Sequence, residues 1–466
     1  MNRNWIPNII PEIKEEMLKV LGIKDVEELF TDIPQEVKLE RSLDLPPPVC
    51  EQEALKEIKK ILSKNLTFED IPIFLGSGVW PHHLPSAVSN VVERSEFLTS
   101  YTSYQAEISQ GMLQGLWEYQ SLICELTGMD VANASMYDWA SSLGEAALMA
   151  ARLTKRRRIL VPQAIHPDRL STLLNYVSGV GLQIQTVPYN RLKGALDVEK
   201  LEELLGEDVA AVYVEQPNFF GVIEEEVEEI GKLGHEKGAL FIVGVDVTSL
   251  GLLRAPGDYG ADIVVGEGQP FGNPASFGGP LLGIFACKYD PKTVRSMPGR
   301  IAGWTTVKDR EEKAFCLTLQ TREQHIRREK ATSNICSNEA LCALAATVHI
   351  ALLGPEGLKR WGEICMSNAH YAMERIDEIE GFKAPIFEGV HFREFVVKCD
   401  IPNVLMKDIH KELLKLGVHG GKIITEYFPE LGDAAVYSAT EMHSREDIDQ
   451  LIDSLEKVVK KEKSAS

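Results

Sequence analysis

The stretch that decides the fold is Ala239-Leu-Phe-Ile-Val-Gly-Val-Asp246, an apolar run of strand length that ends in a carboxylate. Further apolar runs of strand length lie at residues 158–162, 183–187, 209–214, 262–265 and 280–287, and an acidic helix is expected at 223–237. Continuous apolar strands separated by helices are typical of a largely parallel sheet that is covered on both faces. The pattern therefore predicts an α/β domain.

The flanking regions predict three parts of the chain. Helical spacing of apolar residues indicates helices at 12–21, 51–62, 110–126, 141–151, 337–353 and 355–378. The tail reads strand 392–399, helix 406–416, strand 434–438 and helix 444–460, which is typical of a small α+β domain. Residues 1–90 are interrupted by prolines and cannot close a core, so we expect them to wrap around this chain or a neighbour. The expected parts are 1–90, 91–335 (large α/β domain) and 336–466 (small domain).

Composition excludes several classes of partner. Lys+Arg 49 against Asp+Glu 69 gives a formal net charge of −20, which argues against nucleic acid and anionic membranes as partners. No run of about eighteen apolar residues predicts a membrane span, and Met1 to Glu15 has no apolar signal core. The eight cysteines form no CxxC pair, so we expect reduced thiols, a cytoplasmic location and no metal site.

Residues 209–288 contain part of what a pyridoxal phosphate (PLP) enzyme needs. Such an enzyme needs a carboxylate for the pyridine nitrogen, main-chain amides for the phosphate and a lysine for the imine. Asp246 offers the first, and Ser141 and Ser142, in a small-residue turn that enters a helix, offer the second. An aspartate at a strand end is more often a turn or cap residue, however, and the two serines serve equally well as plain N-caps. The lysine is missing between Lys237 and Lys288, and Gln269 stands where it is wanted. An amide forms no imine.

Two polar stretches are further candidates for a site. Residues 317–334 concentrate positive charge in an acidic chain, at Arg322, Arg327, Arg328 and Lys330. Thr332, Ser333 and Asn334 follow with hydroxyl and amide donors, and the combination suits an anion such as phosphate. A solvated helix face with i,i+4 ion pairs is an equal alternative. Residues 101–111 are polar and aromatic, so Tyr104 and Glu107 either reach a ligand or belong to a packed connector.

The same segments resemble the glycine dehydrogenase (decarboxylating) family, the P-protein of the glycine cleavage system, and in particular the first of its two chains. The resemblance covers nearly the whole chain and is densest at residues 96–111, 119–138, 260–269, 276–280, 297–301 and 319–336. It implies the fold of type I PLP-dependent transferases, with a mostly parallel sheet in the large domain. Trp139 and Trp304 depart from the family pattern, and Trp139 would fill the phosphate turn.

The resemblance also implies what the chain does. Two homologous chains pair as α2β2, and the second chain carries the imine lysine and the PLP. The complex decarboxylates glycine and passes the aminomethyl group to the lipoyl arm of the H-protein. This chain would hold no covalent PLP and would complete the partner's site with Lys330, Thr332, Ser333 and Asn334, and also with Tyr104, Glu107 and Arg300. Ser141, Ser142, Asp246 and Gln269 would be a vestigial pocket. The alternatives are an autonomous PLP enzyme that uses Lys288 or another lysine, and a scaffold that tethers the H-protein.

Overall fold

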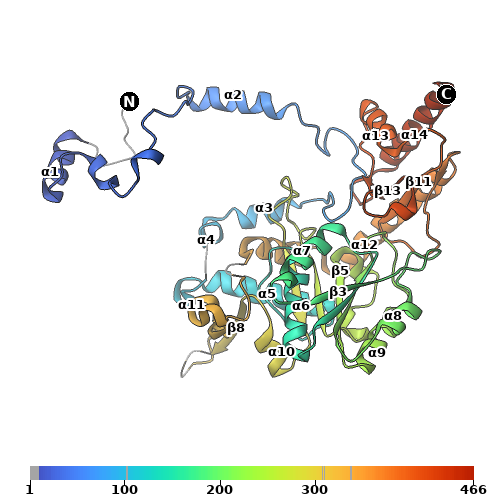
Figure 1. Ribbon diagram of the computed structural model, residues 1–466, viewed down its shortest axis with the longest axis horizontal. Helices are drawn as coiled ribbons and strands as arrows, with labels where there is room; N and C mark the ends of the chain where they lie inside the picture. Colours follow the sequence, from blue (N-terminus) through green and yellow to red (C-terminus); the bar gives the residue numbers. More distant parts are fainter. Residues whose placement is uncertain (1–9, 101–102, 307, 309, 336–337, 466) are drawn as a thin grey trace. The chain divides into compact units, whose positions relative to one another are not determined.

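The computed structural model describes residues 10–100, 103–306, 308, 310–335 and 338–465 (Figure 1). The chain divides into two units, residues 1–66 and residues 67–466. The second unit contains the large sheet and the small sheet, and residues 67–85 take part in it. Phe74, which comes from this segment, is fully buried in the core of the small domain.

The large sheet has seven strands in the order β1-β7-β6-β5-β4-β2-β3. Their bounds are β1 Val131–Ala132, β2 Arg158–Pro162, β3 Gln183–Val187, β4 Val209–Gln216, β5 Leu240–Asp246, β6 Ile263–Glu267 and β7 Gly283–Cys287. Strands β3, β2, β4, β5 and β6 pair in parallel, and β7 is antiparallel to β6 and β1. The predicted mostly parallel sheet is thus confirmed, and the antiparallel strand β7 is an addition to it.

Alternate side chains of the strands face two different cores. Val243 and Val245 of β5 pack with α5 (Gln110–Thr127), α8 (Val198–Leu204), α9 (Val227–Glu236) and the first half of α12 (Ala340–Asp377). Ile242 faces the other way and packs with α6 (Trp139–Thr154) and α7 (Pro167–Ser178). Since both faces are covered, the strands read as continuous apolar runs.

Shorter helices complete the large domain. They are α3 Ser86–Val92, α4 Ser95–Leu98, η4 Ala106–Ile108, η5 Val247–Gly251, η6 Pro256–Tyr259, α10 Pro291–Ser296, η7 Gln320–Arg322, α11 Gln324–Arg327 and η8 Arg328–Lys330.

Helix α12 joins the two domains. It was expected as two helices, and Gly354, with a non-helical φ of 57°, and Pro355 mark a kink where they meet. Residues 336 and 337, where the first of them was expected to begin, lie outside the described residues. Among the described helices, α12 alone is long and apolar enough to cross a membrane, but 50% of its apolar window is buried in the structure. A buried core helix gives the same pattern.

The small domain is a four-stranded antiparallel sheet in the order β10-β11-β13-β12, packed against helices. Its elements are β10 Phe382–Lys383, β11 Glu394–Cys399, α13 Met406–Lys415, β12 Lys422–Ile423, η9 Pro429–Leu431, β13 Ala434–Ser438 and α14 Arg445–Ala465. Helix α14 begins with the reciprocal hydrogen bonds between Ser444 and Asp447 that its sequence indicates. The α+β prediction for the tail is confirmed.

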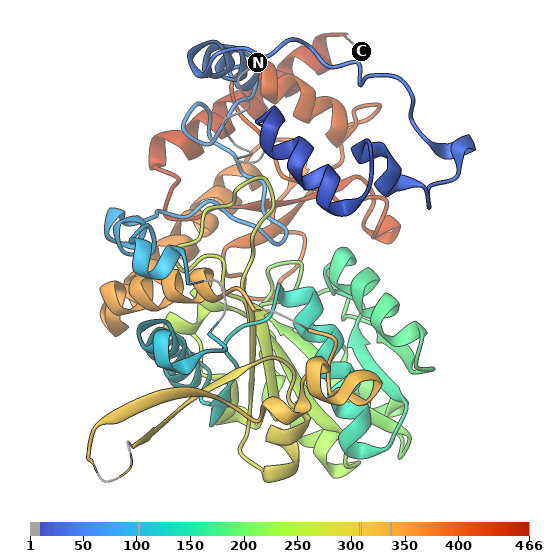
Figure 2. The same ribbon diagram turned by 90° about the vertical axis from the view of Figure 1, so that its left-hand side faces the viewer.

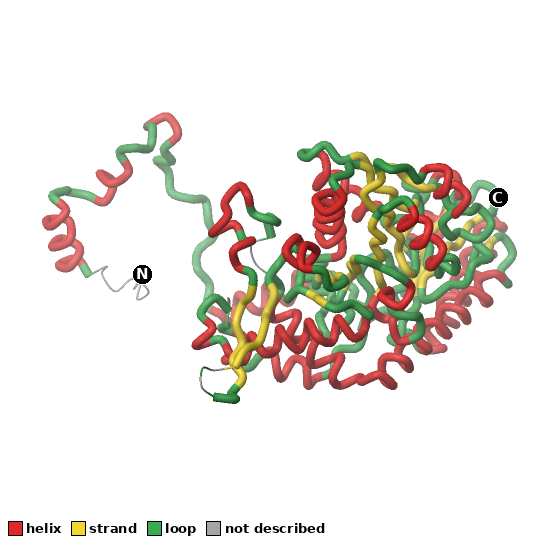
Figure 3. Tube along the Cα trace, turned by 90° about the horizontal axis from the view of Figure 1, so that it is seen from below, coloured by secondary structure: helices red, strands yellow, loops and turns green. Residues whose placement is uncertain are grey.

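A two-stranded ribbon, β8 (Ile301–Thr306) and β9 (Lys313–Thr318), projects from the large domain (gold in Figure 2, yellow at the lower left in Figure 3). Two glutamines of α5 fix its base. Gln120 exchanges two hydrogen bonds of 2.9 and 2.8 Å with the main chain of Ala302. Gln110 does the same with Phe315, at 2.9 and 2.8 Å. The ribbon was not predicted.

The first unit is described from residue 10 and is here called the N-terminal arm (residues 10–66). It contains α1 (Pro11–Leu21), η2 (Val26–Phe30), η3 (Gln35–Val37) and α2 (Glu51–Leu62). The two helices match the predicted ones, and 45–49 has no regular structure, as its prolines require. None of the arm's residues is buried. The expected boundaries at 90 and 335 stay predictions.

Candidate functional site

The carboxyl ends of β5 and β6 meet at one edge of the large sheet, where open α/β sheets place their sites. Asp246 ends β5 and pairs in register with Glu267, which ends β6. Gly283 begins β7 opposite Glu267, because that strand runs the other way. Asp246 and Gln269, two residues predicted for the vestigial pocket, therefore belong to the same edge of the sheet.

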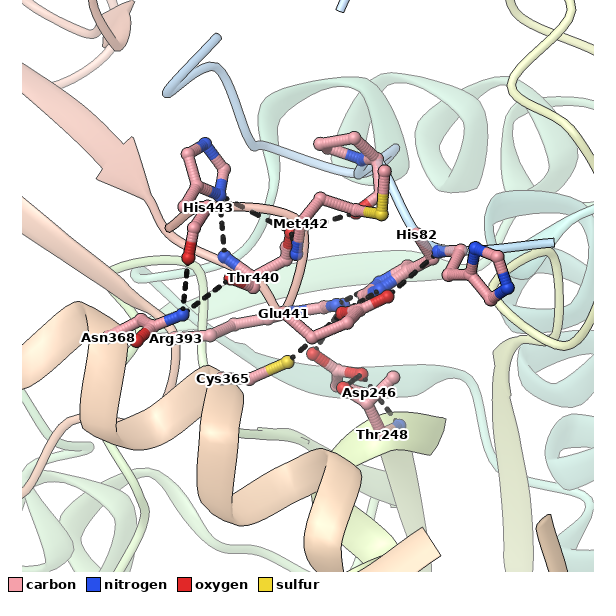
Figure 4. Close-up of polar contacts among 12 residues, drawn as sticks. His82, Asp246, Thr248, Cys365, Asn368, Arg393, Thr440, Glu441, Met442 and His443 are labelled. Carbon is pink, nitrogen blue, oxygen red and sulfur yellow. Dashed lines mark hydrogen bonds and ion pairs between the residues drawn. The ribbon is translucent and has the colours of Figure 1, made fainter. Parts of the chain in front are cut away.

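The negative charge of Asp246 is balanced by neighbouring groups of the protein itself. One carboxylate oxygen accepts hydrogen bonds from the main-chain N–H and the hydroxyl of Thr248, at 3.0 and 2.7 Å. The other oxygen lies 2.6 Å from Nη2 of Arg393, which precedes β11 of the small domain (Figure 4). Only 1% of the Arg393 side chain is exposed, and its guanidinium stacks over the ring of Trp80 at 3.7 Å. The pair joins the two domains at the sheet edge.

Arg393 continues into a chain of hydrogen bonds that ends at Glu441 (Figure 4). Its Nη1 donates to Nε2 of His82 at 2.6 Å, because a guanidinium can only donate. His82 then carries its proton on Nδ1 and donates it to Glu441 at 2.8 Å. Burial opposes a charge on Glu441, yet the hydrogen bonds from His82 and from the main chain of His83 bring its pKa down to about 2. The chain thus links two buried, opposite charges through a neutral imidazole.

The residue types around His82 would suit a metal ion, but their protonation states would not. Donor atoms of His82, Cys365 and Glu441 lie within 4.8 Å of one another. A metal on Nδ1 of His82 would displace that proton and leave Nε2 to carry one, facing the donor Arg393. Burial also raises the pKa of the Cys365 thiol, which opposes the thiolate that a metal binds. We therefore assign the cluster to the ion-pair network. The seven described cysteines are free, and Cys336 lies outside the described residues.

Gln269 is buried and engaged within its own loop. Its main-chain N–H donates to Glu267 at 3.0 Å, and its side-chain amide donates to the main-chain oxygen of Asn273. Glu267 also accepts from the main-chain N–H groups of Leu282 and Trp139, at 2.8 and 3.2 Å. Burial raises the pKa of Glu267 to about 7 despite these donors. The loop is a hydrogen-bonded unit whose sequence contains no amine side chain.

The N-terminus of α6 is closed by its own side chains. Asp138 is the N-cap, and it exchanges hydrogen bonds of 2.6 and 3.1 Å with Ser141. Ser142 donates to the main-chain oxygen of Asp138 at 2.8 Å. Ser141 and Ser142 thus support a cap whose acceptor is Asp138, and no phosphate is needed to explain them.

Trp139 covers the strand face beside this cap. Its indole N–H donates to the hydroxyl of Tyr213 at 3.0 Å, and the guanidinium of Arg169 stacks on its ring at 3.7 Å. A Cβ built on Gly244 of β5 would lie 2.7 Å from the indole, so the ring rests on bare backbone. Glu215 lies 3.2 Å from Nε of Arg169, which balances that buried charge.

These residues do not fit PLP. The carboxylate that would face the pyridine nitrogen is paired with Arg393, the sequence offers Gln269 in place of the lysine, and an indole fills the turn. The cavity that Asp246, Arg393, Trp139 and their neighbours enclose measures about 10 Å³, which holds about one water molecule. A larger cavity of about 220 Å³ lies along the same edge, where Asp138, Trp139 and Glu267 are among its lining residues, and no lysine lines it. The group implied by the fold therefore has no room beside Asp246 and no covalent anchor among the residues described at this edge.

Lys288 cannot replace the missing lysine, because it lies beyond the opposite edge of the sheet. Cys287, at the end of β7, pairs with Ile263, at the start of β6, whereas Asp246 pairs with Glu267 at its end. At about 3.3 Å per residue, the two ends of β6 are on the order of 13 Å apart.

A second cluster gathers several residues of the predicted interface site. The guanidinium of Arg300 contacts the hydroxyl of Tyr104 and lies 4.2 Å over its ring. Nε of Arg300 is 3.7 Å from Glu323. A second cavity of about 10 Å³ is lined by Arg300, Thr332 and Ser333 together with Met297, Pro298, Gly299, Arg322, Glu323 and Ile335. The structure thus brings Tyr104, Arg300, Thr332 and Ser333 together.

Arg322 holds the segments of this cluster together by hydrogen bonds to main-chain oxygens, and it adds a positive charge to the cluster. Its guanidinium donates to three main-chain oxygens, those of Met297, Gly299 (3.1 Å) and Leu319 (3.2 Å). Burial lowers the pKa of Arg322, because the guanidinium loses its contact with water. The attraction of nearby Glu323 raises the pKa and offsets this effect only in part. Carbonyl groups do not cancel a positive charge, so the cluster keeps a local positive potential that suits an anion.

The other predicted interface residues lie at the surface. Glu107, Lys330 and Asn334 are exposed, and none of them lines the cavity beside Arg300. The main-chain and side-chain oxygens of Asn334 accept from Gln324 at 2.9 and 3.1 Å. A role for these three residues stays a prediction.

Sequence reasoning missed the residues that close the sheet edge, namely Trp80, His82, Arg169, Arg393 and Glu441. One signal was present. Arg393 interrupts an apolar run at the start of the predicted strand 392–399, and a charged residue there needs a buried partner.

Comparison with known proteins gives consistent results. The profile of the glycine cleavage system P-protein family matches residues 5–455. The probable glycine dehydrogenase (decarboxylating) subunit 1 of Pyrococcus horikoshii is 52% identical over 98% of this chain and 100% of its own length. A crystal structure of inhibitor-bound glycine decarboxylase (P-protein) superposes with a TM-score of 0.86 at 39% identity, over 96% of this chain and 98% of the other. A sphingosine-1-phosphate lyase of Burkholderia pseudomallei shares the fold, with a TM-score of 0.65 at 14% identity over 91% and 93% of the two chains.

Proposed function

Because this chain belongs to the glycine cleavage system P-protein family and has the type I PLP-dependent fold, we propose that it is the cofactor-free half of a two-chain glycine dehydrogenase (decarboxylating). A homologous second subunit binds PLP covalently, and the two chains assemble as α2β2 in the cytoplasm. The complex decarboxylates glycine and passes the aminomethyl group to the lipoyl H-protein. This chain alone is inactive.

The observation that carries the proposal is the ion pair between Asp246 and Arg393. In a PLP site of this fold the strand-end carboxylate must be free to face the cofactor. Here Arg393 neutralises it from the small domain at 2.6 Å, and Gln269 replaces the amine. The strand-end carboxylate thus belongs to a structural ion pair, so we expect any catalytic contribution of this chain to come from another surface.

The residues proposed for that contribution are Tyr104, Glu107, Arg300, Lys330, Thr332, Ser333 and Asn334. Their support is electrostatic: Arg300 and Arg322 place two guanidinium groups beside one carboxylate, Glu323, and next to the hydroxyl groups of Thr332 and Ser333. Fixed donors of this kind stabilise an anion without reorganisation during the reaction. We propose that they serve the phosphate of the partner's PLP or the carboxylate of glycine.

The location of the cofactor is tested by producing both chains together and reducing the complex with borohydride. Mass spectrometry of the peptides then locates the PLP–lysine adduct. We expect the adduct in the second subunit alone and no imine absorbance when this chain is mixed with PLP. A stoichiometric adduct on any lysine of this chain would show an autonomous enzyme instead.

The contribution of this chain is tested in the assembled complex with Lys330→Ala and Thr332→Ala. Loss of one fixed donor to a reacting anion costs about 100-fold in turnover. Lys232→Ala, on the exposed face of α9, is the matched control and should leave turnover unchanged. Full turnover in both site variants would favour the alternative that this chain is a scaffold for the H-protein.

A further inference from the structure

We propose that the cavity of about 220 Å³ along the sheet edge binds a free α-amino acid through its two charged groups. Its walls come from residues 77–79, from the start of α6 and of α7, and from Glu267 and Leu281. It is called the Arg169 cavity below, after the buried cation that lines it. The inference concerns this chain alone, so it is independent of the second subunit.

Arg169 supplies the positive charge of the cavity. Its side chain is only 9% exposed, yet its Nε and Nη1 have no hydrogen-bond partner among the described residues. Glu215 lies 3.2 Å from Nε and balances the charge, but this contact is not a hydrogen bond. Buried polar groups are normally hydrogen-bonded, and a carboxylate is the group that a guanidinium binds most strongly. The unused donors therefore indicate a carboxylate on the ligand.

A serine hydroxyl lies beside the same helix. Ser77 lines the cavity, and its buried Oγ has no hydrogen-bond partner within the described part of the chain. The main-chain oxygen of Ser77 accepts from Nε2 of His166, the N-cap of α7, at 2.8 Å. Burial lowers the pKa of His166 to about 3, so this imidazole is neutral and adds no charge. The hydroxyl is thus held next to the first turn of α7 and can donate to a ligand carboxylate.

Carboxylates supply the negative charge of the cavity. Glu267 and Asp138 both line it, and Asp168 adds a third carboxylate where the cavity meets solvent. The hydrogen bonds that Glu267 accepts come from main-chain N–H groups, one of them that of Trp139 at 3.2 Å. Burial raises the pKa of Glu267 to about 7, and the groups that oppose this rise are amides without charge. An ammonium group on the ligand would supply the missing counter-charge.

Trp139 separates the two charges by the length of one side chain. Its main-chain N–H donates to Glu267, whereas the guanidinium of Arg169 stacks on its ring at 3.7 Å. Buried charges must be paired, so a simple anion would be repelled by the carboxylates and a simple amine by the guanidinium. A zwitterion satisfies both ends, and α-amino acids are the smallest common ligands of this kind.

Calorimetric titration of the full-length chain with glycine, L-alanine and L-serine tests the inference. We expect at least one of them to bind with a Kd on the order of 1 mM, since so small a ligand makes only two charge-assisted contacts. Acetate and methylamine each carry one of the two charges. Each should therefore bind at least about tenfold more weakly than the amino acid.

Two substitutions assign the two ends of the ligand. Asp138→Asn keeps an N-cap for α6 but removes a negative charge, so it should weaken amino-acid binding about tenfold without weakening acetate binding. Ser77→Ala removes a hydroxyl that has no partner in the fold, and it should weaken both ligands about fivefold. Asp197→Asn is the matched control, because Asp197 caps α8 and does not line the cavity. It should leave each Kd unchanged.

Several results would overturn the inference. One is no binding of the three amino acids at concentrations about twentyfold above the expected Kd. Equal affinity for acetate or inorganic phosphate would mean a site for anions only, and equal affinity for methylamine a site for cations only. Binding that neither Asp138→Asn nor Ser77→Ala changes would lie elsewhere on the chain. None of these results affects the proposed function, which depends on where the PLP adduct is found in the complex.

Discussion

Removing the guanidinium of Arg393 should open the contact between the two domains. The Arg393→Met variant keeps much of the side-chain volume but leaves the Asp246 carboxylate buried without its counter-charge. Charge centres about 4 Å apart at an effective dielectric constant of about 20 attract by about 4 kcal/mol. This agrees with the roughly 3–5 kcal/mol that is typical when one partner of a buried pair is removed. His82 also loses the donor to its Nε2, which adds about 1 kcal/mol.

The reasoning is checked with a double-mutant cycle read by native-state hydrogen exchange of Phe395, Val396 and Val397 in β11. We expect Arg393→Met and Asp246→Asn each to lower the free energy of opening by about 3–5 kcal/mol. The double variant should cost about 2–3 kcal/mol less than their sum, because the neutral amide introduced by Asp246→Asn no longer needs a cation. A coupling below about 0.5 kcal/mol would refute the pairing, and Asp246 would then be free to face a cofactor.

Three further predictions concern other parts of the structure. The folded pKa of Glu441 is about 2 against an ordinary 4.5, so its stabilisation is complete above about pH 4.5 and is lost as the pH falls toward 2; the protection factor of the His83 amide, which is the exchange rate of an unstructured amide at the same pH relative to its own, should fall over that window. Trp139→Ala should cost about 3–5 kcal/mol in urea unfolding and still give no imine absorbance with PLP, because no lysine is introduced. Gln120→Leu removes both hydrogen bonds to β8, so exchange of the ribbon should accelerate by about tenfold or more, with α5 itself unchanged.

Sequence patterns located the large sheet well, because its strands are buried on both faces and their apolar runs are continuous. The bounds of β2 and β3 agree with the predicted ones to the residue. The ribbon β8–β9 was missed for the opposite reason. Its strands mix apolar and polar residues and are exposed toward the tip, and they are held by glutamines of α5 that are distant in sequence. Pairing of this kind leaves no local signal.

In the candidate site, too, features with a local sequence signal were predicted and contacts between distant residues were not. The sequence alone predicted the missing lysine at Gln269 and the carboxylate at Asp246, because each follows from the residue type at one position next to a predicted strand. The partner of Asp246 was not, because Arg393 belongs to the other domain and only the folded chain brings them to 2.6 Å. The N-cap is Asp138, whereas the capping alternative in the sequence named Ser141 and Ser142, since both residue types cap helices.

The ion pair between Asp246 and Arg393 opposes PLP binding beyond the loss of the covalent anchor. A chain that had lost only its lysine would still present a carboxylate, a phosphate turn and an open pocket, and could bind PLP without a covalent bond. Here Arg393 neutralises the carboxylate, and Trp139 covers the turn. Buried charges must be paired, so once Asp246 and Arg393 stabilise each other, neither can change alone without a cost of several kcal/mol. The pocket has thereby become the joint between two domains. The stabilising contribution of this pair explains a buried, charged aspartate at the sheet edge without any cofactor.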